Sequence, residues 1–216
     1  MAATHLIVVR HGETLWNVEG RYQGHLDSPL TDKGLAQSKT LAQRLASRPF
    51  NALYSSDLGR ARQTAEIVRE ITGHPVQLDP RLRERHLGVL QGLTKLELPS
   101  CLPREFDEYR RGGPDHVVPQ GESARQRYQI VTACFEELAK RHERETIVVV
   151  AHGGTLSALL RRVLGVPLEV PRRFRVTNTA LNRFTWEGGR WYLEVWGDAS
   201  HWESRPEISP VAEGSL

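Results

Sequence analysis

The sequence contains little cysteine and no long apolar run. Only two of its 216 residues are cysteines, Cys101 and Cys134, which fit reduced thiols better than a disulfide framework. No apolar segment is long enough to cross a bilayer, and no repeat or low-complexity tract divides the chain. The amino terminus, Met1 to His5, runs straight into a strand-like segment without the regions of a signal peptide. We therefore expect a cytoplasmic protein.

The charge of the chain is nearly balanced. It has 29 Lys and Arg against 26 Asp and Glu, for a formal net charge of +3, and the basic residues are interleaved with acidic ones. Local concentrations of arginine at 60–62, 81–85 and 110–111 fit a small anionic substrate better than a nucleic-acid duplex. We expect a small phosphorylated metabolite as partner, no nucleic acid and no membrane, and either a monomer or a homodimer.

Short apolar runs alternate with helical patterns along the chain. Four runs predict strands, at residues 6–9, 52–55, 76–78 and 147–151. Four amphipathic patterns predict helices, at residues 31–48, 60–72, 123–142 and 154–164. The alternation predicts an α/β fold, a three-layer α/β/α sandwich around a mostly parallel sheet. Residues 183–186 and 191–196 are expected to add a hairpin to that sheet.

One region breaks this alternation. Residues 81–121 are interrupted by proline and glycine and hold at most two short helical pieces, which is typical of a lid or substrate loop. With 39% apolar residues the chain can build one substantial core. We expect residues 1–202 to form a single domain that includes this lid, and 203–216 to form a flexible tail.

Charged and nucleophilic side chains follow three of the predicted strands. Arg10 and His11 come directly after the first strand, and His152 follows the last of the four. Arg60 lies shortly after the strand at 52–55. The carboxyl ends of parallel strands form the ligand crevice of open α/β sheets, so these residues are expected to converge on one anion. Histidine beside arginine at such a place indicates phosphate chemistry.

Several ordered motifs surround these residues. They lie at 10–17, 23–31 with Gly34, 55–64, 81–88 with Gly92, 119–123 and 151–154. Together the motifs resemble the histidine phosphatase superfamily, which also contains the cofactor-dependent phosphoglycerate mutases, and the likeness extends from residue 5 to about 202. A lone Arg-His-Gly arises easily by chance, whereas an ordered series does not.

The resemblance implies a role for each main candidate. His11 would take the phosphoryl group as a phosphohistidine, which water then hydrolyses. Arg10 and Arg60 would hold the phosphate oxygens, and their charge would lower the pKa of His11 and keep it nucleophilic. His152 would contact the transferring phosphoryl group. Glu84 would protonate the leaving group and later activate water.

Weaker assignments concern the surrounding loops. Four positions match phosphate- or substrate-binding positions of the family: Asn17, Gln23, Gly24 and Gly153. Leu15 and Trp16 are expected to anchor their loop in the core. Glu13, the rival acid, is expected to face away from the site as a structural partner. His25, His86 and His201 are expected to be structural or exposed.

No metal or other cofactor is expected. A metal site is the rival interpretation of a two-histidine pair. However, Arg10 adjoins His11, and no Cys, Asp or Glu spacing supplies a clear third and fourth ligand.

These features favour a metal-independent phosphatase acting on small phosphomonoesters, with two alternatives left open. The first is a phosphoglycerate mutase, because the segment at 84–95 resembles that branch and Arg110 with Arg111 would clamp a substrate carboxylate. The interval from Glu84 to His152 is shorter than in typical mutases, and a shorter lid favours hydrolysis. The second is a phospholigand-binding protein without catalysis, against which the complete set of candidate residues argues.

Overall fold

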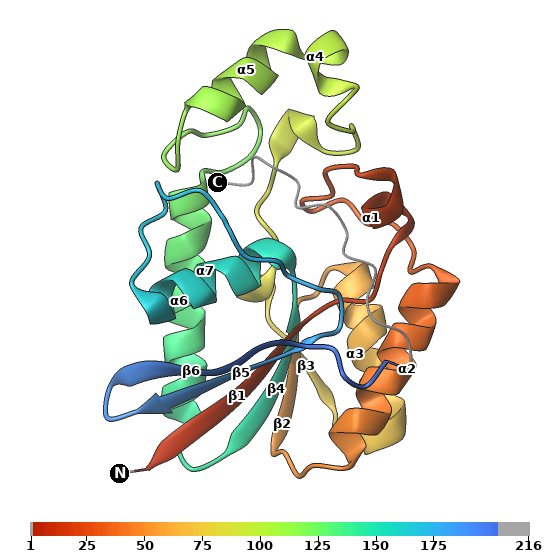
Figure 1. The fold of residues 1–216 in the computed structure, drawn as a ribbon, viewed down its shortest axis with the longest axis vertical. Helices are drawn as coiled ribbons and strands as arrows, with labels where there is room; N and C mark the ends of the chain where they lie inside the picture. Colours follow the sequence, from red (N-terminus) through yellow and green to blue (C-terminus); the bar gives the residue numbers. More distant parts are fainter. Residues whose placement is uncertain (1, 203–216) are drawn as a thin grey trace.

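A six-stranded sheet forms the centre of the structure, a computed structural model that describes residues 2–202 (Figure 1). The strands lie in the order β3-β2-β4-β1-β5-β6. Their bounds are β1 (Ala3–Arg10), β2 (Ala52–Ser55), β3 (Val76–Leu78), β4 (Thr146–Ala151), β5 (Leu181–Glu187) and β6 (Arg190–Asp198). The first four strands of that order are parallel, and the expected hairpin, β5 and β6, adds two antiparallel strands at one edge.

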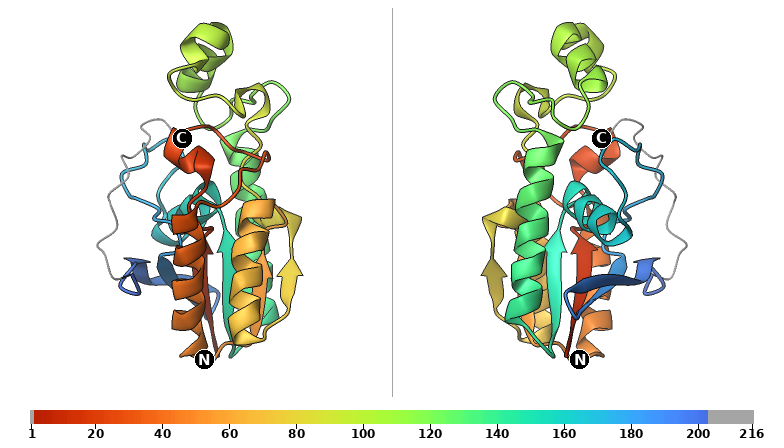
Figure 2. Two further views of the ribbon diagram at one scale, coloured as in Figure 1. Left: turned by 90° about the vertical axis from the view of Figure 1, so that its right-hand side faces the viewer. Right: turned by 90° about the vertical axis from the view of Figure 1, so that its left-hand side faces the viewer.

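Helices cover both faces of the sheet, as the alternation of the sequence predicts (Figure 2). One face carries α2 (Asp32–Ala46) and α3 (Gly59–Thr72), and the other carries α6 (Ala124–Arg141) and α7 (Gly153–Leu164). Successive residues of β1 point to opposite faces. Ile7 therefore packs with α2 and α3, whereas Leu6 packs with α6 and α7. Burial on both faces explains why these strands are continuous apolar runs.

The helix boundaries follow local signals that the sequence displays. Thr31 caps α2 by accepting a hydrogen bond from the Gly34 N–H at 2.9 Å. Gly73 ends α3 in the left-handed conformation, with φ of 78°. Ser123 opens α6 with a reciprocal capping box to Gln126. One short helix, α1 (Leu15–Glu19), is absent from the expectations and begins at a similar box on Thr14.

The segment at 81–121, here called the lid segment, lies beyond the carboxyl ends of the parallel strands (Figure 1). The 3₁₀ helix η1 (Pro80–Leu82) leads into it, and it contains η2 (Gly88–Leu90), α4 (Leu98–Cys101) and α5 (Pro103–Arg111). A small apolar cluster of its own holds it together, formed by Leu87, Leu90, Leu98, Tyr109 and Val118. The lid segment is therefore a packed unit and not a bare loop.

Two further expectations concern membranes and the tail. Within residues 2–202, no helix combines the length and apolar character that crossing a bilayer requires. The expected flexible tail, 203–216, lies outside the described residues.

The burial of β2 between the sheet's two layers of helices generates a stability prediction. Leu53 of β2 is 0% exposed, whereas Leu96 of the lid segment is 91% exposed. Leu53→Ala should lower the free energy of unfolding by about 2–5 kcal/mol, because it leaves a cavity between the sheet and α3. The matched Leu96→Ala should change it by less than about 0.5 kcal/mol. Urea unfolding followed by tryptophan fluorescence measures both, and equal effects would contradict this account of the core.

Candidate active site

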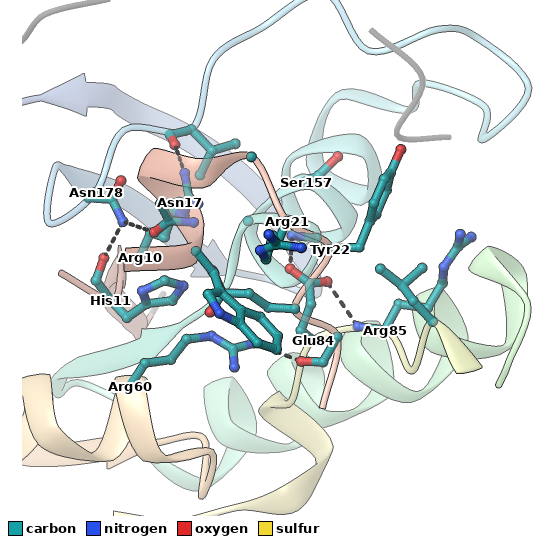
Figure 3. A pocket seen from close by; sticks show the side chains of 18 of the residues that line it. Arg10, His11, Asn17, Arg21, Tyr22, Arg60, Glu84, Arg85, Ser157 and Asn178 are labelled. Atoms are coloured by element: carbon teal, nitrogen blue, oxygen red, sulfur yellow. Dashed lines mark hydrogen bonds between the residues drawn. The ribbon is translucent and has the colours of Figure 1, made fainter. Parts of the chain in front are cut away.

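A pocket of about 1070 Å³ opens at the carboxyl ends of the parallel strands (Figure 3). Most of the residues expected at a site line it: Arg10, His11, Asn17, Gln23, Gly24, Arg60, Glu84 and Gly153. His152 is not among the lining residues, but its ring centroid lies 5.4 Å from that of His11. The structure thus brings together the candidate residues from four distant parts of the chain.

The pairing of β1 with β4 sets the two histidines beside each other. The strands are parallel, with Arg10 opposite Ala151. The His11 N–H donates to the Ala151 carbonyl at 3.0 Å. His11 and His152 therefore follow neighbouring strands at the same level, and both side chains are buried.

The hydrogen bond of the His11 ring determines which nitrogen is free. Nδ1 lies 2.7 Å from the carbonyl oxygen of Gly12. Because a carbonyl can only accept, Nδ1 carries the hydrogen and Nε2 keeps its lone pair in the neutral ring. Burial, reinforced by the charges of Arg60 and Arg10, holds the pKa of His11 well below its usual range. The geometry and charge leave His11 a neutral imidazole with a nucleophilic Nε2.

His152 is the second buried imidazole and stands at the start of α7. Its Nε2 lies 2.8 Å from Ser56 Oγ, which also accepts a hydrogen bond from the Leu58 N–H. Its Nδ1 is buried and has no hydrogen-bond partner among residues 2–202. Burial lowers the pKa of His152 well below its ordinary value, and the charge of Arg60 adds to the effect. A buried ring nitrogen without a partner is suited to contact a ligand.

Two guanidinium groups, the buried one of Arg60 and the partly buried one of Arg10, flank the histidines. Arg60 donates through its Nη atoms to the carbonyl of Gly24 at 2.8 Å and to Asp27 Oδ1 at 2.9 Å. Arg10 donates to the carbonyl of Val176 at 2.9 Å. Burial lowers the pKa of Arg10 to about 10, so the group stays charged at neutral pH. In both arginines Nε is buried and unpaired within the described part of the chain, which leaves donors for an anion.

Glu84 is fixed at the edge of this cationic region. Its Oε1 accepts from the Arg85 N–H at 2.9 Å and its Oε2 from the Gly154 N–H at 2.8 Å. A Cβ on Gly154 would lie 2.0 Å from Oε1, so any larger residue there would displace the Glu84 carboxylate. A Cβ on Gly153 would lie 3.8 Å from Arg10 Nε and 3.9 Å from Glu84 Oε2. Gly153 thus lies between a phosphate-binding candidate and the candidate acid.

The loop residues near His11 support its backbone. Asn178 donates to the His11 carbonyl at 2.7 Å and reaches Asn17 Oδ1 at 3.4 Å (Figure 3). Gln23 donates to Thr14 Oγ1 at 2.9 Å, and its own Oε1 is buried with no partner in the described chain. Sequence reasoning missed Asn178, because no motif distinguishes it within the loop before β5.

Two expectations about the loop after His11 need correction. Leu15 is exposed, and α1 buries none of its residues. Trp16 lines the pocket, so neither residue anchors the loop in the core. The cause is that α1 lies at the pocket and not on the sheet. Glu13 is a structural partner as expected, since it accepts from Thr31 Oγ1 at 3.0 Å, but it also lines the pocket.

The expectation that Arg110 and Arg111 clamp a carboxylate is wrong. Neither residue lines the pocket. Arg110 lies over the Phe106 ring at 5.8 Å, and Arg111 is exposed and paired with Asp107 at 3.0 Å. Their position on the outer side of α5 directs both toward solvent.

The remaining candidate histidines, His25 and His86, lie outside the lining of the pocket. His25 and His86 contact each other, with ring centroids 4.6 Å apart, and do not line the pocket. His25 also bonds the Glu84 carbonyl at 2.8 Å. Across residues 2–202, no cluster of three or more His, Cys, Asp or Glu side chains could hold a metal ion.

The geometry agrees with a known family. The model of the histidine phosphatase superfamily (branch 1) matches residues 6–199. The chain belongs to this superfamily. Phosphoglycerate mutase-like protein 4 of Arabidopsis thaliana is 39% identical over 202 residues, which cover 92% of this chain and 86% of the relative. That likeness places a mutase-like protein among the relatives of this chain.

Solved structures of the superfamily share the fold. YhfR of Bacillus stearothermophilus has a TM-score of 0.82 and 39% identity, over 92% of this chain and 98% of its own. The alpha-ribazole phosphatase from Shigella flexneri has a TM-score of 0.82 and 30% identity, over 90% and 96%. These relatives support an enzyme of the phosphatase and mutase group.

The two buried histidines generate a pH prediction. Their pKa values lie below the ordinary value of 6.5 only in the folded protein. Below about pH 6.5 the unfolded chain therefore takes up protons that the folded protein cannot. The free energy of unfolding should fall from pH 7.5 to pH 5, by up to about 1.4 kcal/mol per pH unit for each histidine.

Urea unfolding at a series of pH values measures this slope. The double variant His11→Gln/His152→Gln should show a shallower slope than the wild type. His5→Gln, which removes an exposed histidine at the opposite end of β1, should leave the slope unchanged. An unaltered slope in the double variant would mean that the two rings do not resist protonation.

Proposed function

We propose that this histidine phosphatase hydrolyses small phosphomonoesters through a phosphohistidine on His11, without a metal. The observation that carries the proposal is the pair of buried, neutral imidazoles between two arginines whose Nε donors are unpaired. A tetrahedral phosphate group would supply oxygen acceptors to Arg10, Arg60 and His152 at once. No neutral ligand satisfies so many cationic donors.

In the first step, Nε2 of His11 attacks phosphorus and the bond to the leaving-group oxygen breaks. Glu84, in its protonated form, gives its proton to that oxygen, so the alcohol leaves neutral. The hydrogen bond from His11 Nδ1 to the Gly12 carbonyl holds the ring in place and stabilises the charge it acquires. Arg10 and Arg60 neutralise the phosphoryl oxygens throughout.

In the second step, the Glu84 carboxylate takes a proton from water, and the oxygen attacks phosphorus. The N–P bond breaks, inorganic phosphate leaves, and His11 and Glu84 return to their starting forms. The backbone donors of Arg85 and Gly154 orient the carboxylate for both steps. One carboxylate can thus serve as acid and base in turn.

Phosphoglycerate mutase is the second candidate, favoured by the likeness to the mutase-like relative from Arabidopsis thaliana. A mutase must keep water from its phosphoenzyme. The pocket of about 1070 Å³ is far larger than one phosphate group and leaves room for water beside it. The arginine pair at 110–111 that would clamp the carboxylate also faces away. Both observations favour hydrolysis.

The nucleophile can be tested by trapping. Wild-type protein mixed with a ³²P-labelled phosphomonoester in EDTA should carry acid-labile, base-stable label, as expected for phosphohistidine. His11→Ala should carry none and should lose turnover, while its urea midpoint changes little because the residue buries little apolar area. Label on serine or aspartate, or a strict requirement for a divalent ion, would overturn the mechanism.

The role of Glu84 can be tested through the leaving group. Glu84→Gln should slow hydrolysis of alkyl phosphates by about a hundredfold or more, because an alkoxide needs a proton to leave. The burst of phenolate from an activated aryl phosphate should be much less impaired, because a phenolate leaves unaided. Stopped-flow absorbance measures that burst.

Glu13→Gln is the matched control, since Glu13 also lines the pocket but is bonded to Thr31. It should affect alkyl and aryl substrates equally and weakly. If Glu84→Gln slowed the phosphorylation of His11 equally for alkyl and aryl substrates, Glu84 would be excluded as the acid.

A further inference from the structure

Arg172 is a pocket residue that the proposed mechanism does not use. It lies on the loop between α7 and β5 and lines the pocket. The side chain is half-buried, and its Nε is buried without a hydrogen-bond partner in the described chain. Burial lowers the pKa of Arg172, whereas Glu84 and Tyr109 act to raise it. The guanidinium therefore lies in the electrostatic neighbourhood of the candidate acid.

Several other arginines that line the pocket have partners within the protein, whereas Arg175 also lines it but is exposed and has no side-chain partner among residues 2–202. Arg161 donates to two backbone carbonyls, at 2.5 and 2.6 Å. Arg127 pairs with Glu122 at 2.6 Å, and Arg21 pairs with Glu97 at 2.7 Å. No hydrogen bond or ion pair within residues 2–202 holds Arg172. A partly desolvated cation without a partner raises the free energy of the folded protein, and a bound anion would remove that cost.

Glu84 does not serve as that partner. Its two oxygens already accept from the backbone N–H groups of Arg85 and Gly154, and no ion pair joins it to Arg172 within the described residues. The charge of Arg172 also lowers the pKa of Arg10. Arg172 thus stands beside the catalytic groups without belonging to the phosphate clamp.

We propose that Arg172 binds a second anionic group carried by the alcohol portion of the substrate, and so selects phosphomonoesters that bear a carboxylate or another phosphate. This inference rests on the proposed hydrolysis. Glu84 must reach the leaving-group oxygen, so the alcohol portion lies on the Glu84 side of the phosphate. Arg172 lines the pocket together with Glu84 and Tyr109, whose charges act on it, whereas the charges that act on His11 and His152 include those of Arg60 and Arg10 and not that of Arg172.

The lid segment frames the same side of the pocket. Tyr109 of α5 is buried, lines the pocket, and carries the Arg85 guanidinium over its ring at 5.1 Å. Tyr22 contacts Tyr109 edge to face, with ring centroids 6.1 Å apart. Aromatic walls limit access of water, which strengthens a charge-assisted bond to Arg172.

Two matched substrate pairs test the inference. 3-Phosphoglycerate and glycerol 3-phosphate differ only by a carboxylate in place of a hydroxymethyl group, and fructose 1,6-bisphosphate and fructose 6-phosphate differ by a second phosphate. Wild-type kcat/KM should be higher for the anionic member of at least one pair. Arg172→Gln should reduce that preference by about tenfold to a hundredfold, mainly through the anionic substrate.

Two further variants control for charge and folding. Arg173→Gln removes a neighbouring arginine that is exposed and does not line the pocket, and it should keep the wild-type preference. Arg172→Lys retains the charge and should keep part of the preference for the anionic substrate. The pair that responds to Arg172→Gln distinguishes a carboxylate from a phosphate.

Each other outcome overturns the inference. If Arg172→Gln lowered kcat/KM equally for both members of each pair, Arg172 would act through Glu84 or through the stability of the fold. A wild type that hydrolyses p-nitrophenyl phosphate but shows no preference for an anionic member would overturn the inference and leave the proposed function standing. A wild type that hydrolyses no phosphomonoester would overturn both.

Discussion

The parallel pairing of β1 with β4 is the constraint on which the rest of the site depends. It fixes Arg10 opposite Ala151, and the His11 N–H continues the same ladder. A slip of one residue would turn every side chain of β1 to the other face of the sheet. Both faces are buried against helices, so such a slip would require both cores to repack. The packing of β1 therefore fixes the positions of Arg10 and His11 at the end of the strand.

The site also shows how a fold tolerates buried cations. Arg60 and Arg10 are held by backbone carbonyls and by Asp27, which offset part of the desolvation cost of each guanidinium. The His11 and His152 imidazoles avoid the cost of burying a charge because burial lowers their pKa and keeps them neutral. Arg10 and Arg60 thus give the pocket a positive potential. Because their side chains are already held in place, they need not reorient when an anion binds.

The sequence predicts the sheet and helices because their signals are local. Thr31, Gly73 and the apolar runs of the strands each act within a few residues, and the structure confirms the elements they indicate. Arg10, His11, Arg60 and His152, each at a strand or helix end, could also be brought together in advance, whereas Glu84 is assigned from the family resemblance. Whether they perform the proposed steps stays a prediction that the geometry supports.

What could not be predicted depends on packing between distant segments. The exposure of Leu15 and the orientation of Arg110 follow from how α1 and α5 sit against the pocket, which no local pattern encodes. Asn178 and Arg172 lie on a loop without periodicity and reach the site only through the tertiary fold. For that reason, the residues at the strand ends could be predicted from the sequence, whereas Asn178 and Arg172 could not.

The anchoring of Glu84 to the start of α7 divides the molecule by its freedom to change. The carboxylate accepts a hydrogen bond from the N–H of Gly154, next to His152 and β4, so Glu84 is held by the same frame that positions His11. Glu84 and Arg85 lie at the start of the lid segment, and the rest of that segment packs on its own apolar cluster and donates no hydrogen bond to the Glu84 carboxylate. Changes in the outer part of the lid segment would therefore leave the position of the Glu84 carboxylate unaltered, so substrate preference and the proposed phosphoryl transfer can vary independently.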